Sequence, residues 1–155
     1  MAVDVFLVCK DIKGEATDKE FPDAIEINGL RWGIQGGGHG TRVDSEVRNV
    51  TIRKDVDRAS PIIWMFCATH GQIKEMKLHF RKAGKNPLTY LTIKLEKVYV
   101  VSTDLQVGEK GEVPQEIVEL DFILFDAEYQ PQSLTGAKSG GAVMFSWDAG
   151  KNKGS

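Results

Sequence analysis

The feature that most constrains the fold is a run of alternating apolar and polar residues over Ile73–Lys82. Alternation with a period of two indicates a β-strand that turns one face toward a core and the other toward polar surroundings. The turn-forming sequence Ala-Gly-Lys-Asn-Pro follows at 83–87, and a second strand-like stretch, Leu88–Ser102, returns along the chain. The pair predicts a long β-hairpin and a chain organised around antiparallel sheet.

Three predicted strands move their apolar residues from one face to the other partway along. The change falls at Glu96-Lys97 in the return strand, at Asn28-Gly29 within Ala24–Gln35, and near the middle of Ile117–Tyr129. Because one inserted residue turns the pleat over, the pattern predicts a β-bulge at Glu96-Lys97. Long strands that bend and swap faces are typical of barrels and curled sandwiches. Burial of one face in the core and the other against a partner is the alternative cause.

One helix is predicted among these strands. Ser60 is placed as its N-cap, Pro61 in its first turn, Ile62–Thr69 as its body and Gly71 past its end. The body is apolar on nearly every side, so the helix is either buried all round or covers a sheet while touching something else. Four long loops complete the pattern: Asp11–Phe21, Gly36–Ser45, Thr103–Gln115 and Gln130–Gly141. The sequence therefore predicts one β-rich domain over 1–155, with a polar, frayed tail at 150–155.

Composition excludes several classes of protein. The 155 residues hold 20 Lys and Arg against 22 Asp and Glu, a net charge of −2, which argues against a nucleic-acid-binding surface. No apolar run approaches the ~18 residues of a membrane-spanning helix, so no membrane insertion is expected. The apolar stretch Val3–Cys9 lacks a basic segment before it and a cleavage site after it, which favours a strand over a signal peptide. We therefore expect synthesis in the cytoplasm, and any export to proceed without a cleaved signal.

No motif for catalysis or for cofactor binding is evident. The histidines His39, His70 and His79 lack the spacing of a metal site, and the cysteines Cys9 and Cys67 are read as buried thiols. The glycine loop at 36–41 lacks the Gly-Lys-Ser/Thr ending of a phosphate-binding loop, and no Gly-x-Ser-x-Gly elbow is present. We expect no catalytic residue, no metal and no cofactor, which favours a structural or binding role.

An ordered set of segments resembles the haemolysin-coregulated proteins (Hcp), the tube-forming proteins of bacterial type VI secretion. The resemblance covers essentially the whole chain and rests on these segments in order: Met1-Ala2-Val3-Asp4, Asp11–Asp18, Glu26–Gly33 with its Trp32-Gly33 ending, the glycine loop, Asp57–Pro61, Leu78–Gly84, Glu128–Gln132 and Trp147–Lys153.

The resemblance implies a mainly β fold, a single β-barrel of two curled antiparallel sheets with one short flanking α-helix. It also implies hexameric rings that stack into a secreted tube and carry or chaperone effectors in the lumen, with sheath, spike and effector proteins as partners. Strands that are apolar on both faces, such as Val3–Cys9, are expected of a barrel that also docks its neighbours.

Two groups of residues are candidate functional surfaces. The resemblance identifies the glycine loop as an extended loop that reaches adjacent subunits, through Gly36, Gly37, Gly38, His39, Gly40, Thr41 and Arg42. The polar face of the central strand is a candidate lumen wall or outer surface, through Glu75, Lys77, His79 and Arg81. The alternative function is a secreted, monomeric or dimeric β-barrel module that binds a carbohydrate or a host surface.

Overall fold

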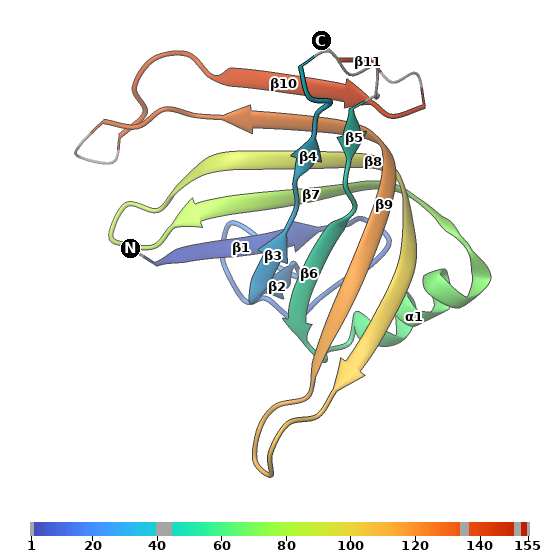
Figure 1. The fold of residues 1–155 in the computed structure, drawn as a ribbon. Helices are drawn as coiled ribbons and strands as arrows, with labels where there is room; N and C mark the ends of the chain where they lie inside the picture. The colour runs from blue at the N-terminus through green and yellow to red at the C-terminus, as the bar shows by residue number, and fades with distance from the viewer. Residues whose placement is uncertain (1, 40–44, 134–136, 151–152, 155) are drawn as a thin grey trace.

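The structure is a computed structural model that describes residues 2–39, 45–133, 137–150 and 153–154. One helix, α1 (Ser60–Thr69), lies among short and long strands (Figure 1). The strands are β1 (Val3–Val8), β2 (Ile25–Ile27), β3 (Gly29–Arg31), β4 (Ile34–Gln35), β5 (Glu46–Val47), β6 (Val50–Asp55), β7 (Gln72–Lys82), β8 (Leu88–Gln106), β9 (Gln115–Tyr129), β10 (Val143–Asp148) and β11 (Lys153–Gly154).

The main sheet curls until it nearly closes on itself. Its antiparallel neighbours run β11-β10-β9-β8-β7-β1-β2, and β6 pairs with both β9 and β3. Because β2 pairs with β1 while β3 pairs with β6, the corner at Asn28 joins the two ends of the sheet. Strands β4 and β5 form a separate two-stranded sheet. The mainly β, barrel-like fold with one short helix is thereby confirmed.

Apolar side chains fill the barrel, and a second cluster lies outside it. Leu7 of β1 and Cys9 just after it join the main core, whereas Phe6 packs outside with Phe21 and Ala24. The chain segment before β2 covers this outer face of β1. The expectation that a neighbouring subunit covers both-sided apolar strands is therefore wrong for β1, because the protein's own loop buries Phe6.

In three adjacent strands, the buried side chains move from one face of the strand to the other, and the three changes lie along one line across the sheet. In β7, β8 and β9, two buried residues stand three apart instead of two: Ile73 and Met76, Leu95 and Val98, Phe122 and Phe125. They form two rows of paired residues, and the pairing register is the same on both sides of the line. The predicted inserted residue at Glu96-Lys97 is therefore wrong. Lys97 instead adopts φ +55°, which turns the strand over without changing its register.

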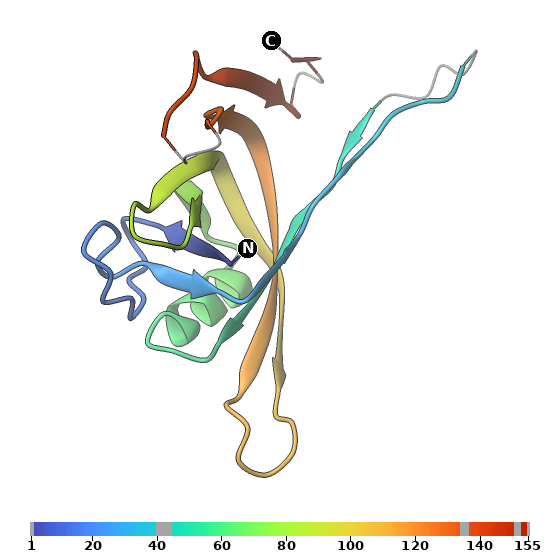
Figure 2. The same ribbon diagram turned by 90° about the vertical axis from the view of Figure 1, so that its left-hand side faces the viewer.

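Register shifts do occur, but elsewhere in β8. One lies opposite Phe80/Arg81 of β7, and the other lies between Val100 and Ser102. β8 continues to Gln106, so the loop predicted over Thr103–Gln115 is shorter than expected, at 107–114. A long, twisted hairpin thus extends beyond the barrel, as Figure 2 shows at its lower edge.

The helix lies where predicted, but its ends are built differently. Ala59 occupies the N-cap position without a side-chain cap, and the Oγ atom of Ser60 accepts the Asp57 N–H from outside the helix. At the other end His70, not Gly71, takes the left-handed conformation (φ +55°). Ile63 packs into the core while Trp64 and Met65 stay exposed, so the helix covers the sheet with one face.

The carboxyl-terminal region returns to the sheet. β10 lies beside the second half of β9, and within the tail expected to fray at 150–155, Lys153–Gly154 pair with Trp147–Asp148 as β11. Among the described residues, no helix has the length and apolar character needed to cross a membrane.

Candidate assembly surfaces

The first candidate surface is an arm formed by β4, β5 and the loop between them. Figure 2 shows β4 and β5 extending away from the barrel. Its base is fixed by a hydrogen bond from the Arg48 N–H to the Gly33 carbonyl (3.0 Å) and by a bond from the Arg48 guanidinium to Gln35 (3.1 Å). Below it, Trp32 stacks on the core residue Phe125 with ring centroids 4.3 Å apart. The arm therefore projects from a rigid base.

The described part of the predicted loop follows β4 on this arm. Gly36, Gly37, Gly38 and His39 are exposed, while Gly40, Thr41 and Arg42 lie outside the described residues. A methyl group added at Gly36 would meet no atom within 4 Å, so packing inside the monomer does not demand glycine there. A role for the glycines in contact with another molecule stays a prediction.

The second candidate surface, the polar face of β7, is divided into two halves. Glu75 and Lys77 are half-buried, and their side chains form a 3.6 Å ion pair with each other. His79 and Arg81 are instead covered by the loop that precedes β2, where His79 stacks on Phe21 at 4.7 Å. Burial lowers the pKa of His79, and the nearby Lys77 lowers it further. Only the first half of the face is open to a lumen or to solvent in the monomer.

Arg81 holds that covering loop in place. Its guanidinium donates to both oxygens of Asp18, at 2.9 and 2.6 Å, and lies 5.0 Å from the ring centre of Phe6. Asp4 adds a weaker contact at 3.4 Å. The hydrogen bonds from Arg81 hold the pKa of the Asp18 carboxyl far below its ordinary value, and the carboxylate raises the pKa of Arg81 in return. A two-pronged pair of this kind fixes geometry as well as charge.

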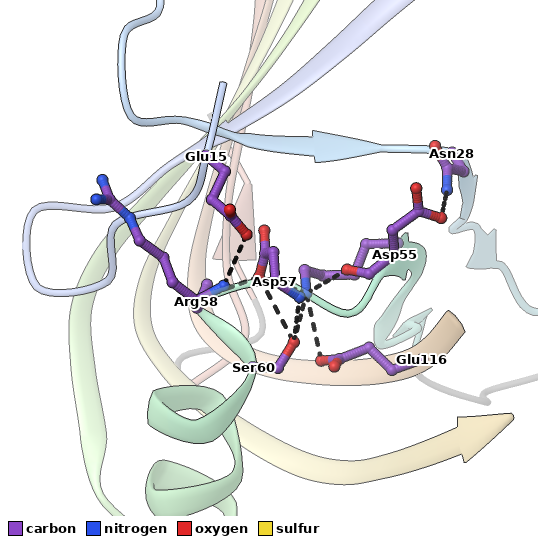
Figure 3. A network of polar contacts seen from close by, with 9 residues as sticks. Glu15, Asn28, Asp55, Asp57, Arg58, Ser60 and Glu116 are labelled. Carbon is purple, nitrogen blue, oxygen red and sulfur yellow. Dashed lines mark hydrogen bonds and ion pairs between the residues drawn. The ribbon is translucent and has the colours of Figure 1, made fainter. Parts of the chain in front are cut away.

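A buried charge network joins β6, β9 and the start of α1 (Figure 3). The Lys54 ammonium donates to the Asp55 carbonyl (2.9 Å) and to Ser60 Oγ (3.0 Å), and it pairs with Asp57 Oδ1 (2.9 Å). Glu116, fully buried, lies 3.6 Å away and accepts no hydrogen bond among the described atoms. Lys54 has three protons and three nearer acceptors, so Glu116 is held by charge alone.

Sequence reasoning missed this network, although a signal for it was present. Lys54 follows Val50 and Ile52 at a spacing of two, which places it on the inward face of β6. The sequence predicts Ser60 as the helix N-cap, but its Oγ atom accepts hydrogen bonds from the Lys54 ammonium and the Asp57 N–H instead. The partner Glu116 comes from β9, and no local pattern links it to Lys54.

Among the described residues, the exposed apolar side chains include three neighbouring sets. Val143 and Met144 on β10 are 63% and 67% exposed, and Phe145 beside them is 38% exposed. The hairpin formed by β8 and β9 exposes Leu105, Val107 and Val113 near its tip, and α1 exposes Trp64 and Met65. Exposed apolar side chains that gather in patches mark sites of contact with other molecules. No group of three or more metal-ligating side chains occurs among the residues that the structure describes.

Comparison with known proteins agrees with this architecture. The family described as "Type VI secretion system effector, Hcp" matches residues 6–129. Protein hcp1 of Pseudomonas aeruginosa strain PAO1 is 36% identical over 162 residues, which span 98% of each chain. The crystal structure of Hcp1 from Salmonella typhimurium is 31% identical and superposes with a TM-score of 0.83 over 100% of both chains.

A further solved structure, of a type six secretion system protein, superposes with a TM-score of 0.90 at 22% identity, over 99% of this chain and 100% of the other. At that identity it supports the fold alone. The curled barrel and the two sequence relatives together define a structural protein of a secretion apparatus. The chain belongs to the Hcp family of the bacterial type VI secretion system.

Proposed function

We propose that six copies of this chain close into a ring, that rings stack into a tube, and that the secreted tube carries or chaperones effectors in its lumen. The role is structural rather than enzymatic. Before assembly the protein resides in the cytoplasm, and it leaves the cell through the apparatus without a cleaved signal peptide. Its partners are further copies of itself, together with the sheath, spike and effector proteins of the same system.

The open edge of β10 carries this proposal. β10 pairs with β9 along one side, whereas its other side pairs with β11 only at Trp147–Asp148. On that side, no strand of the described residues pairs with Val143–Ser146. Proteins normally protect such an edge, because unpaired backbone groups invite another strand. Here the edge carries Val143 and Met144 with their side chains exposed. A neighbouring copy that covers this edge would pair the free backbone groups and bury the exposed apolar side chains.

Ring closure follows if each copy offers this edge to a different patch on the next copy. Such a heterologous contact closes into a ring when its rotation divides the circle evenly. The mild net charge of −2 allows many copies to pack without strong repulsion. The family membership sets the expected number of copies at six.

Light scattering coupled to gel filtration tests the proposal directly. We expect a mass six times the 17.2 kDa of the monomer, and end-on electron micrographs should show rings with an open centre. A monomer or dimer that persists at high concentration would contradict the ring. Glycan-array binding by such a monomer would then support the alternative of a secreted β-barrel binding module.

A further inference from the structure

The β8–β9 hairpin and the barrel corner at Asn28 border a cleft of about 1030 Å³. Leu105, Val107 and Val113 of the hairpin line it, and these three aliphatic side chains are 56%, 68% and 58% exposed. The end of β6 contributes Asp55 to the lining. The cleft therefore presents aliphatic side chains to solvent on a concave surface that also holds polar groups.

The walls of the cleft are joined by hydrogen bonds. The Val56 N–H donates to the Pro114 carbonyl (3.0 Å), which ties the hairpin to the end of β6. The side-chain amides of Asn28 and Gln115 both donate to Asp55 Oδ1, at 2.8 and 3.4 Å, and the first of these bonds is drawn in Figure 3. A surface that is formed before binding loses little conformational freedom when a ligand enters it. The cleft is thus suited to receive a partner without rearrangement.

The charges around the cleft have one sign. Two smaller hollows share Asn28 with it, and every ionisable residue that lines the cleft or these hollows is acidic: Asp4, Glu15, Glu26, Asp55, Asp57 and Glu112. Some of these groups are engaged within the chain, as Asp57 is with Lys54. Glu26 and Glu112 enter none of the side-chain hydrogen bonds or ion pairs of the described residues. Their carboxylates therefore remain available to a basic ligand.

The sequence around the hairpin has the same bias. Between Lys97 and Lys138 the chain holds eight Asp and Glu residues and a single basic residue, Lys110. Lys110 belongs to the turn of the hairpin and does not line the cleft. Because the whole chain has a net charge of only −2, this excess of acidic residues is a property of the segment. A ligand of the cleft is therefore selected for positive charge as well as for apolar side chains.

Two surfaces of a second copy each match only one of these requirements. The turn between β7 and β8 carries Lys82 and Lys85, but it exposes no large apolar side chain. The edge of β10 exposes Val143 and Met144, but the sequence from 139 to 150 has no Lys or Arg. A segment of another protein that intersperses aliphatic side chains with Lys or Arg matches both requirements at once.

We propose that the hairpin cleft is a docking site for a segment of a partner protein in which aliphatic side chains are interspersed with lysine or arginine. The aliphatic side chains pack against Leu105, Val107 and Val113, and the cations lie beside Glu26 and Glu112. The site does not depend on ring closure, so it goes beyond the proposed tube. Salt screens the charged part of such a contact, and the affinity should therefore fall as the ionic strength rises.

A short labelled peptide composed of Leu, Lys and Ser probes the site, with fluorescence anisotropy as the measurement. One comparison peptide has Glu in place of each Lys, and another has Ser in place of each Leu. We expect saturable binding of the first peptide alone. Glu112→Lys should weaken that binding by roughly tenfold or more, as the cost of facing like charges implies. Val107→Ser should weaken it severalfold, because apolar contact is lost.

Each variant has a matched control outside the cleft. Asp11→Lys makes the same charge change as Glu112→Lys at an exposed acidic residue. Val101→Ser makes the same change as Val107→Ser at an exposed position of β8. Neither control should alter the affinity for the peptide. All four substituted residues are exposed, so the fold should be retained, which circular dichroism checks.

Selective binding that falls in Glu112→Lys and Val107→Ser, but in neither control, supports the docking site. Absence of binding overturns it, as do equal affinities for the Lys and Glu peptides or equal affinities of Glu112→Lys and Asp11→Lys. Light scattering on the same samples tests the ring separately. Loss of the six-fold mass in the two cleft variants alone would assign the cleft to contact between copies and overturn the inference. A wild-type protein that forms no ring refutes the proposed tube and leaves the peptide result unchanged.

Discussion

Lys54 shows how one buried side chain can connect three parts of the fold. Its ammonium group contacts the end of β6, the turn before α1 and the buried Glu116 of β9. Taking both charges out of water is costly, and their attraction repays that cost only when the remaining polar groups are satisfied. Glu116 lacks hydrogen bonds among the described atoms, so it depends on Lys54.

We expect Lys54→Met to lower the free energy of unfolding by about 3–5 kcal/mol, because it leaves Glu116 as an uncompensated buried charge. Urea denaturation followed by circular dichroism measures the change. The double variant Lys54→Met, Glu116→Met should recover much of the loss, since the fully buried, uncompensated charge of Glu116 is then gone. Lys13→Met, at an exposed lysine, is the control and should change the unfolding free energy by less than about 0.5 kcal/mol.

Asp18 and Arg81 set a dependence on pH. The guanidinium of Arg81 lowers the pKa of Asp18 in the folded state, so the pair contributes stability above the unfolded-state pKa, near about 3.9 for aspartate. That contribution is lost as the pH falls and the carboxylate takes up its proton. We expect wild type to be more stable than Asp18→Asn at neutral pH, with a difference that shrinks steadily below about pH 5.

Chemical denaturation at a series of pH values measures this difference. In an Arg81→Met background the same substitution should show a smaller trend, because the guanidinium that most lowers the pKa of Asp18 is gone while the N–H groups of Glu20 and Phe21 still donate to the carboxylate. A difference between wild type and Asp18→Asn that stayed constant from neutral to acidic pH would contradict the assignment.

At the scale of single elements, the buried side chains of β7, β8 and β9 change face along one line across the sheet. Ile73, Val98 and Phe122 form one buried row, and Met76, Leu95 and Phe125 form the next. The alternation in the sequence correctly predicted that β8 and β9 reverse faces, but it did not predict the reversal in β7. The pattern suggested a bulge because an inserted residue and a residue in the left-handed conformation shift the apolar residues to the other face in the same way. Only the register between strands separates the two causes.

Lys97 allows a test of that geometry. With φ at +55°, it holds a conformation that costs an L-residue roughly 1–2 kcal/mol and that β-branched residues tolerate worst. We expect Lys97→Val to destabilise the fold by about that amount, and Lys97→Gly to be neutral or stabilising. Thermal unfolding compares the two. Lys74→Val is the control, at an exposed position of the neighbouring strand β7, and should have little effect.

The arm is the element that the sequence located best and explained least. Its glycine loop was identified, and the structure extends the arm through β4 and β5. Glycine content alone could not distinguish a flexible loop from an arm that projects from a fixed base. The distinction rests on Trp32 and Arg48, which fix the base through contacts with Phe125 and Gly33.

At the scale of the whole molecule, separate exposed surfaces are available for contact with other copies. The arm and the β8–β9 hairpin project from the barrel in different directions, and β10 lies away from the hairpin (Figures 1 and 2). A side-to-side contact can close a ring, and an end-to-end contact can extend a stack. The proposed tube requires both kinds of contact, each through its own surface.

Met144 tests the first of these contacts. Met144→Glu places a charge in the apolar edge of β10, so we expect the protein to remain folded but to lose its six-fold mass. Light scattering reports the mass, and circular dichroism confirms the fold. Met144→Leu keeps the apolar surface and should form rings as wild type does. Intact rings formed by Met144→Glu would remove the β10 edge from the interface.

The sequence by itself determined the strands, the helix and the family, because these depend on local periodicity and on ordered motifs. The tertiary structure decided which groups meet across the chain. It paired Lys54 with Glu116, brought Arg81 under Asp18, and covered His79, which the pattern had placed on one open polar face. It also made the arm and the β8–β9 hairpin project from the barrel in different directions. Such contacts arise when the sheet curls and closes, and the period of a single strand carries no record of its distant neighbours.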